Sequence, residues 1–159
     1  MTVRVGFGFD VHEYVSGRPL ILGGVEIPHE KGLAGHSDAD ALIHAVVDAL
    51  LGAAALGDIG QHFPDTDSRY KDMNSRGFLR LILHKVSSEN YRISNVDATV
   101  VAQAPRISPY AEQMKKIIAG DLEISASQVN IKATTTESLG FVGRKEGVAV
   151  WAVASLERI

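Results

Sequence analysis

The pattern of apolar positions predicts strands and helices that alternate along the chain. Val3 to Phe9 alternates apolar with small or polar residues, as a half-buried strand does. Residues 21–27 predict a β-hairpin whose two central glycines adopt positive φ. From Ser37, placed to cap a helix, to about Ala55, apolar residues recur with helical period. The chain is therefore expected to begin with strands that pack against a helix.

The second half repeats this alternation. A helix is expected from near Ser75, a strand over 93–102, a helix opened by Ser108 and Pro109, and strands over 129–134 and 148–156. This order predicts an α+β fold, an α/β sandwich in which helices cover one face of a mixed sheet. We expect one domain spanning residues 1–159, with a partner on the other face of the sheet.

Composition excludes several classes of protein. Sixteen Lys and Arg against nineteen Asp and Glu leave a net charge of -3, and no basic run is long enough to follow a nucleic-acid backbone. Residues 41–56 are too short and too polar for a membrane span. The N-terminus lacks the zones of a signal peptide, so a cytoplasmic enzyme is expected. Because cysteine is absent, a metal site must use His nitrogen and carboxylate oxygen.

Three residues have the spacing of a catalytic zinc site. Asp10 and His12 are two positions apart at the end of a predicted strand, so both side chains leave the same face. His44 lies about one turn inside the next helix and could complete a three-ligand site with an open fourth position. The alternative is that Asp10 is a turn residue and the two histidines are ordinary polar positions.

Three further segments have phosphate or polyol chemistry. His36 and Ser37 precede a helix N-terminus that favours anions, although Ser37 with Asp40 also fits plain capping. The loop 57–74 has no periodic segment and carries acids that suit sugar hydroxyls, or simply solvation. Residues 134–137 end a strand with three threonines and a glutamate, which suits phosphate and a hard cation such as Mg²⁺, although threonine also favours strands. Gly6 and Gly8 lack the third glycine of a dinucleotide-binding motif.

These motifs, taken in order and spacing, closely resemble the 2-C-methyl-D-erythritol 2,4-cyclodiphosphate synthase family. They are Gly8 to His12, Gly35 to Asp40, His44, Gly57 to Gly60, Phe63 to Asp67 and Ala133 to Glu137. The resemblance implies that 4-diphosphocytidyl-2-C-methyl-D-erythritol 2-phosphate is cyclised and CMP released, a lyase step of non-mevalonate isoprenoid biosynthesis. A zinc-dependent phosphoester hydrolase and a non-catalytic trimer that binds isoprenoid diphosphates are the alternatives.

The resemblance also implies roles for individual residues. Zn²⁺ would be held by Asp10, His12 and His44, and a second divalent cation, Mg²⁺ or Mn²⁺, by Glu137. Transition-state stabilisation would fall to His36 and Thr135. The implied substrate-binding residues are Ser37, Asp58, Ile59, Gly60, Phe63, Asp65, Asp67, Thr136, Phe141 and Arg144, with cytidine near Ala102, Arg106, Ile107, Ala133 and Thr134.

The resemblance finally implies a homotrimer whose sheets pack around a central cavity and whose active sites lie between subunits. Phe9 and Arg144 would border that cavity, which would be suited to an isoprenoid diphosphate. The implied partners are thus a cytidine diphosphate substrate and two further copies of the chain.

Overall fold

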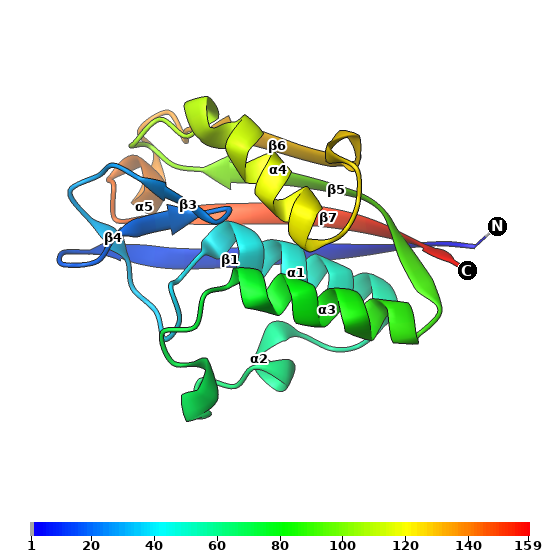
Figure 1. Ribbon diagram of the computed structural model, residues 1–159. Coiled ribbons are helices and arrows are strands. Elements are labelled where there is room, and N and C mark those ends of the chain that lie inside the picture. Colours follow the sequence, from blue (N-terminus) through cyan, green and yellow to red (C-terminus); the bar gives the residue numbers. More distant parts are fainter. Residues whose placement is uncertain (1) are drawn as a thin grey trace.

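A long antiparallel pair, β1 (Val3–Val15) and β7 (Gly147–Arg158), forms the middle of the sheet (Figure 1). The computed structural model describes residues 2–159. The strand order is β4-β1-β7-β5-β6, with β4 at Gly32–Leu33, β5 at Tyr91–Val101 and β6 at Val129–Thr134. Among the strands of residues 2–159, only β5 and β6 pair in parallel, so the predicted mixed sheet is confirmed.

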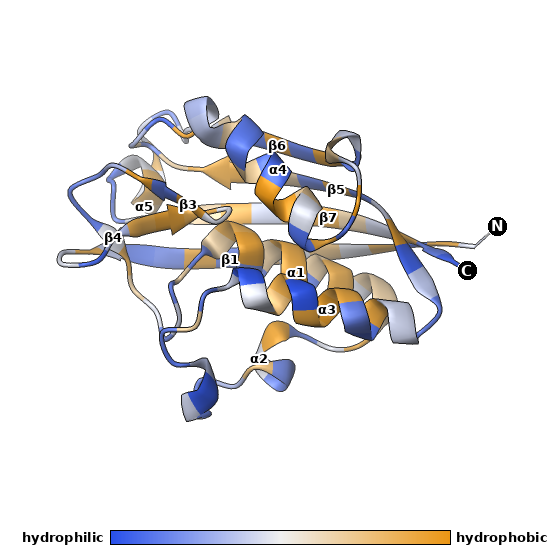
Figure 2. Ribbon diagram, in the orientation of Figure 1, coloured by the Kyte–Doolittle hydropathy of each residue, from blue (hydrophilic) through white to orange (hydrophobic). Residues whose placement is uncertain are grey.

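Three helices, α1 (Ala41–Ala54), α3 (Arg76–Ser88) and α4 (Ala111–Asp121), cover one face of this sheet (Figure 1). Most of α1 is apolar, as its colouring in Figure 2 shows. Most of its residues are also buried, because α1 packs against the sheet and against α3. The predicted α+β fold with helices on one face is confirmed. The short elements are α2 (Ile59–His62), α5 (Gly140–Gly143), and 3₁₀ turns at Ser68–Tyr70, Ser108–Tyr110 and Ala126–Gln128.

The predicted hairpin is present as a separate two-stranded sheet, β2 (Leu20–Leu22) and β3 (Val25–Ile27). Gly23 and Gly24 have φ of 60° and 76°, as the prediction of positive φ required. Their amides donate to the carboxylate of Asp40, which ties the hairpin to the start of α1.

The predicted helix cap was wrong. Ser37 lies three residues before the cap, and Asp40 is the N-cap because its carboxylate accepts the Ile43 amide at 3.0 Å. Asp40 is completely buried, and this burial raises its pKa to about 6 although backbone amides of Gly23 and Gly24 also donate to it. The contacts with the hairpin make Asp40 the better cap, and they are invisible in the local sequence.

Two boundaries also differ from the prediction. Asp10 and His12 lie inside β1 instead of at its end, because antiparallel pairing with β7 continues to Glu13 and Gly147. The loop 57–74, expected to be without structure, contains α2 and one 3₁₀ turn that Asp58 and Asp67 cap.

Helix α1 crosses β1 so closely that Gly6 has no room for a side chain. A Cβ there would lie 1.9 Å from the Ala49 carbonyl oxygen and 2.3 Å from the Ala53 nitrogen. Because both are backbone atoms, we expect Gly6→Ala to lower the free energy of unfolding by about 3 kcal/mol. Chemical denaturation measures this. Gly120→Ala is the control, since nothing lies within 4 Å of a Cβ there and the helix should gain about 0.5 kcal/mol. An unfolding midpoint of Gly6→Ala equal to that of the wild type would contradict this packing of α1 on β1.

The sheet face opposite the helices carries exposed apolar side chains. Phe9 and Trp151 are 43% and 39% exposed, with ring centroids 5.2 Å apart. The exposed apolar residues of β1 and β7 are Val3, Val5, Phe7, Phe9, Val11, Trp151 and Val153. An apolar surface of this extent is typical of a protein interface. Across residues 2–159, no helix combines the length and hydrophobicity needed to span a bilayer.

Candidate active site

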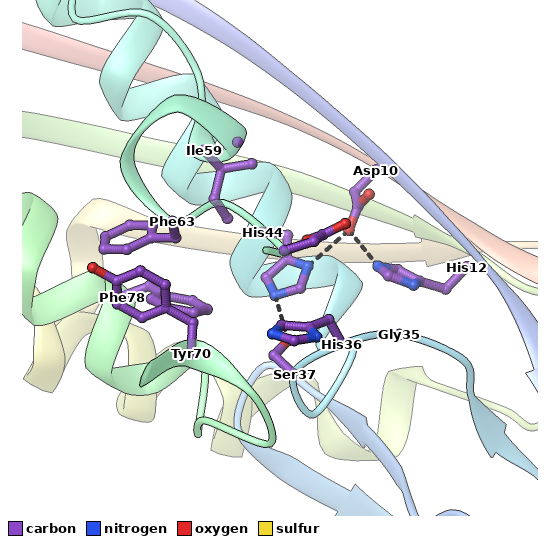
Figure 3. A pocket seen from close by; sticks show the side chains of 12 residues that line it. Asp10, His12, Gly35, His36, Ser37, His44, Ile59, Phe63, Tyr70 and Phe78 are labelled. Carbon is purple, nitrogen blue, oxygen red and sulfur yellow. Dashed lines mark hydrogen bonds and ion pairs between the residues drawn. The ribbon is translucent and has the colours of Figure 1, made fainter. Parts of the chain in front are cut away.

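Asp10, His12 and His44 converge on one point between β1 and α1 (Figure 3). Each offers one ligand atom, and these atoms lie within 4.8 Å of one another. The alternation of β1 directs Asp10 and His12 to the side of the helices, and the first turn of α1 supplies His44. The predicted three-residue cluster is therefore assembled as the spacing indicated.

The electrostatics of the cluster favour a cation. Oδ2 of Asp10 lies 2.9 Å from His12 Nε2 and 3.1 Å from His44 Nδ1. Burial alone would raise the pKa of Asp10, but the hydrogen bonds and charges of the two histidines outweigh it and lower the pKa to about 2. Burial would lower the pKa of His12, but Asp10 reverses this and raises it. A carboxylate oxygen that faces two ring nitrogens requires protons or a metal ion between them.

A backbone carbonyl orients His12 for ligation. Its Nδ1 lies 2.6 Å from the Ala34 carbonyl oxygen, which only accepts, so Nδ1 carries the proton and donates. Nε2, which faces Asp10, is thereby left with its lone pair available to a metal. This set of two imidazoles and one carboxylate fits Zn²⁺ and leaves a fourth position open.

A cavity of about 240 Å³ opens beside this cluster. His36 reaches it with Nε2 buried and, within residues 2–159, without a hydrogen-bond partner. A buried, unpartnered ring nitrogen is costly unless a ligand satisfies it. The lining residues are Asp10, His12, Gly35, His36, Ser37, His44, Ile59, Gly60, Phe63, Asp65, Tyr70 and Phe78.

An aromatic cluster forms one wall of this cavity. Phe63 stacks on Phe78 with centroids 4.4 Å apart, and Tyr70 packs edge-on against Phe63 at 5.3 Å (Figure 3). The loop that carries Phe63 and Tyr70 is fastened to α1, because Asp48 Oδ1 accepts the Ile59 amide at 2.7 Å. Burial raises the pKa of Asp48.

A second cavity, of about 120 Å³, lies at the ends of β5 and β6 and shares no lining residue with the first. It brings together the five residues expected near cytidine with Thr135. Its lining residues are Ala102, Gln103, Pro105, Arg106, Ile107, Ser108, Ala133, Thr134 and Thr135.

Some candidate residues line neither cavity. Glu137, at φ 52°, and Thr136 follow β6, and Phe141 and Arg144 belong to α5 and its end. Arg144 pairs with Glu146 at 3.1 Å. The carboxylates of Asp58 and Asp67 accept backbone amides, and Asp67 also pairs with Arg69.

Sequence reasoning missed several lining residues. Tyr70 and Phe78 complete the aromatic wall, and Gln103, Pro105 and Ser108 line the second cavity. Aromatic residues in a long loop were the only available signal for Tyr70. Phe78 lies within the helix expected from near Ser75, where an apolar residue predicts core packing and gives no sign of a cavity.

A family model described as the YgbB family matches residues 3–157. The chain belongs to this family. It is 60% identical over 155 residues to the 2-C-methyl-D-erythritol 2,4-cyclodiphosphate synthase of Geobacillus thermodenitrificans, covering 98% of this chain and 97% of the relative. It is 58% identical over 156 residues to the synthase of the same name from Methylobacillus flagellatus, covering 98% of each.

Solved structures agree with the family. IspF of Plasmodium falciparum, in complex with CDP, has a TM-score of 0.87 and 36% identity over 98% of this chain and 96% of its own. The bifunctional IspDF of Campylobacter jejuni has a TM-score of 0.96 and 45% identity, over 99% of this chain and 43% of its own. The predicted family, fold and enzyme class are confirmed.

Proposed function

We propose that this chain converts 4-diphosphocytidyl-2-C-methyl-D-erythritol 2-phosphate to 2-C-methyl-D-erythritol 2,4-cyclodiphosphate and CMP, as the family to which it belongs indicates. The observation that supports this most directly is the Asp10, His12 and His44 cluster beside a buried, unpartnered His36 nitrogen. Together they offer a place for a cation and a donor for a phosphate oxygen.

The metal proposed for the cluster is Zn²⁺, held by His12 Nε2, His44 Nδ1 and Asp10 Oδ2. When bound, the ion supplies Lewis-acid charge neutralisation at a diphosphate oxygen. Glu137 is proposed to hold a second divalent cation, Mg²⁺ or Mn²⁺, because a carboxylate suits hard ions.

The protein's task is to position two phosphates. An oxygen of the 2-phosphate attacks the β-phosphorus, the bond from that phosphorus to the bridging oxygen breaks, and CMP leaves with that oxygen. His36 and Thr135 are proposed to donate to the oxygens on which negative charge increases. Because the attack is intramolecular, alignment and charge neutralisation supply most of the rate acceleration.

The two cavities suit the two ends of the substrate. Five residues that line the first cavity, together with Asp58 and Asp67 of the same loop, are proposed to bind the methylerythritol phosphate portion. The five are Ser37, Ile59, Gly60, Phe63 and Asp65. The second cavity is proposed to bind cytidine. The solved complex of the Plasmodium falciparum relative with CDP supports a cytidine nucleotide as a ligand of this chain.

We further propose a homotrimer in which the exposed apolar faces of β1 and β7 pack together. The absence of any shared lining residue between the cavities supports a site completed by a neighbouring subunit. Phe9 and Arg144 would then border a central cavity that admits an isoprenoid diphosphate. The chain is proposed to form one domain over 1–159 and to act in the cytoplasm.

Incubation with the substrate and analysis of phosphorus products by NMR tests the reaction. The proposal predicts the cyclic diphosphate and CMP in equal amounts. Free phosphate would indicate the hydrolase instead, and tight binding of isoprenoid diphosphate without turnover would indicate the binding protein.

Glu137→Gln should weaken the binding of Mg²⁺ or Mn²⁺ that supports turnover far more than it weakens zinc retention. A neutral amide is a poorer ligand for a hard cation, so the concentration of Mg²⁺ for half-maximal turnover should rise about tenfold. Metal titration of turnover measures this, and zinc analysis of the same preparation is the internal control. Superimposable titration curves for the two proteins would argue against this role.

A further inference from the structure

The second ring nitrogen of His44 makes a contact that the metal site does not explain. Nδ1 faces Asp10, and Nε2 on the opposite side of the ring lies 2.9 Å from Oγ of Ser75. Ser75 is completely buried and immediately precedes α3, 31 residues further along the chain than His44. Its hydroxyl caps no amide of its own helix, so its purpose is not local.

The same hydroxyl contacts a carboxylate. Oδ1 of Asp38 lies at short hydrogen-bonding distance from Ser75 Oγ and also accepts the Asp40 amide at 3.1 Å. Oδ2 of Asp38 accepts the Ser75 amide at 2.9 Å. Three donors thus converge on Asp38, and an ionised carboxylate, which only accepts, satisfies all of them.

This arrangement sets the direction of each hydrogen bond. Because Asp38 has no proton to give, the Ser75 hydroxyl must donate to it. Ser75 has then used its single proton and presents only lone pairs to His44. The contact of 2.9 Å is a hydrogen bond only if Nε2 of His44 carries the proton.

We propose that Asp38 and Ser75 are positioning residues that hold His44 as the Nε2-protonated tautomer, leaving the Nδ1 lone pair directed at the metal. The inference rests on the zinc site proposed above. In both histidines, the ring nitrogen that faces away from Asp10 would then carry the proton, because the Ala34 carbonyl fixes the proton of His12 on Nδ1 in the same way. Neither Asp38 nor Ser75 is among the three residues that would hold the metal.

Ser37 is the competing partner for Nε2, but its Oγ is further away, at 3.3 Å. It is also nearer the cavity, whereas Ser75 is completely enclosed. A buried acceptor without competing water is the stronger determinant of the tautomer.

The contact also connects two loops of the site. The Asp38 amide donates to the Met73 carbonyl at 3.3 Å, and the Asp72 amide donates to the His36 carbonyl at 2.9 Å. The segment that carries His36 is therefore held against the segment that leads into α3. The hydrogen-bonded pair of Asp38 and Ser75 joins the two segments where α3 begins.

The test compares zinc affinity of the full-length wild type, Ser75→Ala and Ser88→Ala by competition with a chromophoric chelator. Ser75→Ala should bind zinc about 10- to 100-fold more weakly, because an outer partner of a ligating histidine is lost. Ser88→Ala makes the same change at the far, exposed end of α3 and should leave affinity unchanged. Asp38→Asn, which places a donor among three donors, should also weaken binding.

A spectroscopic measurement separates this role from a merely structural one. In the ¹⁵N-labelled, zinc-loaded wild type, NMR should show a proton on Nε2 of His44 and none on Nδ1. Zinc binding by Ser75→Ala as tight as in the wild type, or a His44 Nε2 without a proton, would overturn the proposed role of Asp38 and Ser75. A wild type that binds no zinc would instead refute the metal site itself, and with it the positioning role of Asp38 and Ser75.

Discussion

Replacing His44 by alanine is expected to abolish zinc binding and nearly all turnover while leaving a folded protein. A three-ligand site loses its geometry when one ligand goes, and the Lewis-acid contribution goes with it. A loss of about 4 kcal/mol of transition-state stabilisation corresponds to roughly a 10³-fold fall in turnover. Zinc content by mass spectrometry and the rate of CMP release measure the two effects.

The helix should tolerate this change, because alanine favours α1 at least as well as histidine does. Circular dichroism should therefore be unaltered. His84→Ala, an exposed histidine on α3, is the matched control and should keep both zinc and activity. Full zinc occupancy in His44→Ala would refute the assignment of this residue.

Mixing two inactive variants should restore part of the activity if the site lies between subunits. His44→Ala lacks the metal but retains the second cavity, whereas Ala133→Trp fills a cavity of about 120 Å³ and retains the metal ligands. Neither variant alone supplies an intact pair of half-sites. In a mixed trimer, an interface is functional where the intact metal ligands of an Ala133→Trp chain meet the open second cavity of a His44→Ala chain.

When equal amounts of the two variants exchange subunits at random, half of the chains have intact metal ligands and the other half have an open second cavity. A site needs one chain of each kind, in the correct order, so about a quarter of the sites should be active. Recovery should follow subunit exchange, monitored by mass spectrometry of differently labelled chains. Homotrimers of each variant, incubated alone, are the controls. A mixture that has exchanged chains and stays inactive would show that each site is built within one subunit.

The sequence by itself determined the elements that local periodicity controls. The two-residue period of β1 places Asp10 and His12 on one face, and His44 follows at the first turn of α1. The hairpin with Gly23 and Gly24 at positive φ, and the strand over 129–134, were likewise predictable. These features depend on backbone geometry and on the identity of neighbouring residues, which the sequence contains directly.

The resemblance of several ordered motifs added what spacing alone left open. Spacing could not separate a zinc ligand from an ordinary surface histidine, because both patterns are common in short stretches. The motifs together identified the family, and the match over residues 3–157 agrees with them.

Only the tertiary structure decided which polar residues support the site. Asp40 replaced Ser37 as the cap because the hairpin amides surround its carboxylate, and Ser75 reached His44 from 31 residues away. The wall formed by Tyr70 and Phe78 was equally hidden. Such contacts join segments that are distant along the chain. They are selected because burying a polar group costs free energy unless it finds a hydrogen-bond partner, and because side chains pack together in the folded protein. The periodicity of the sequence carries no information about these contacts, so they can be identified only once the fold has brought the segments together.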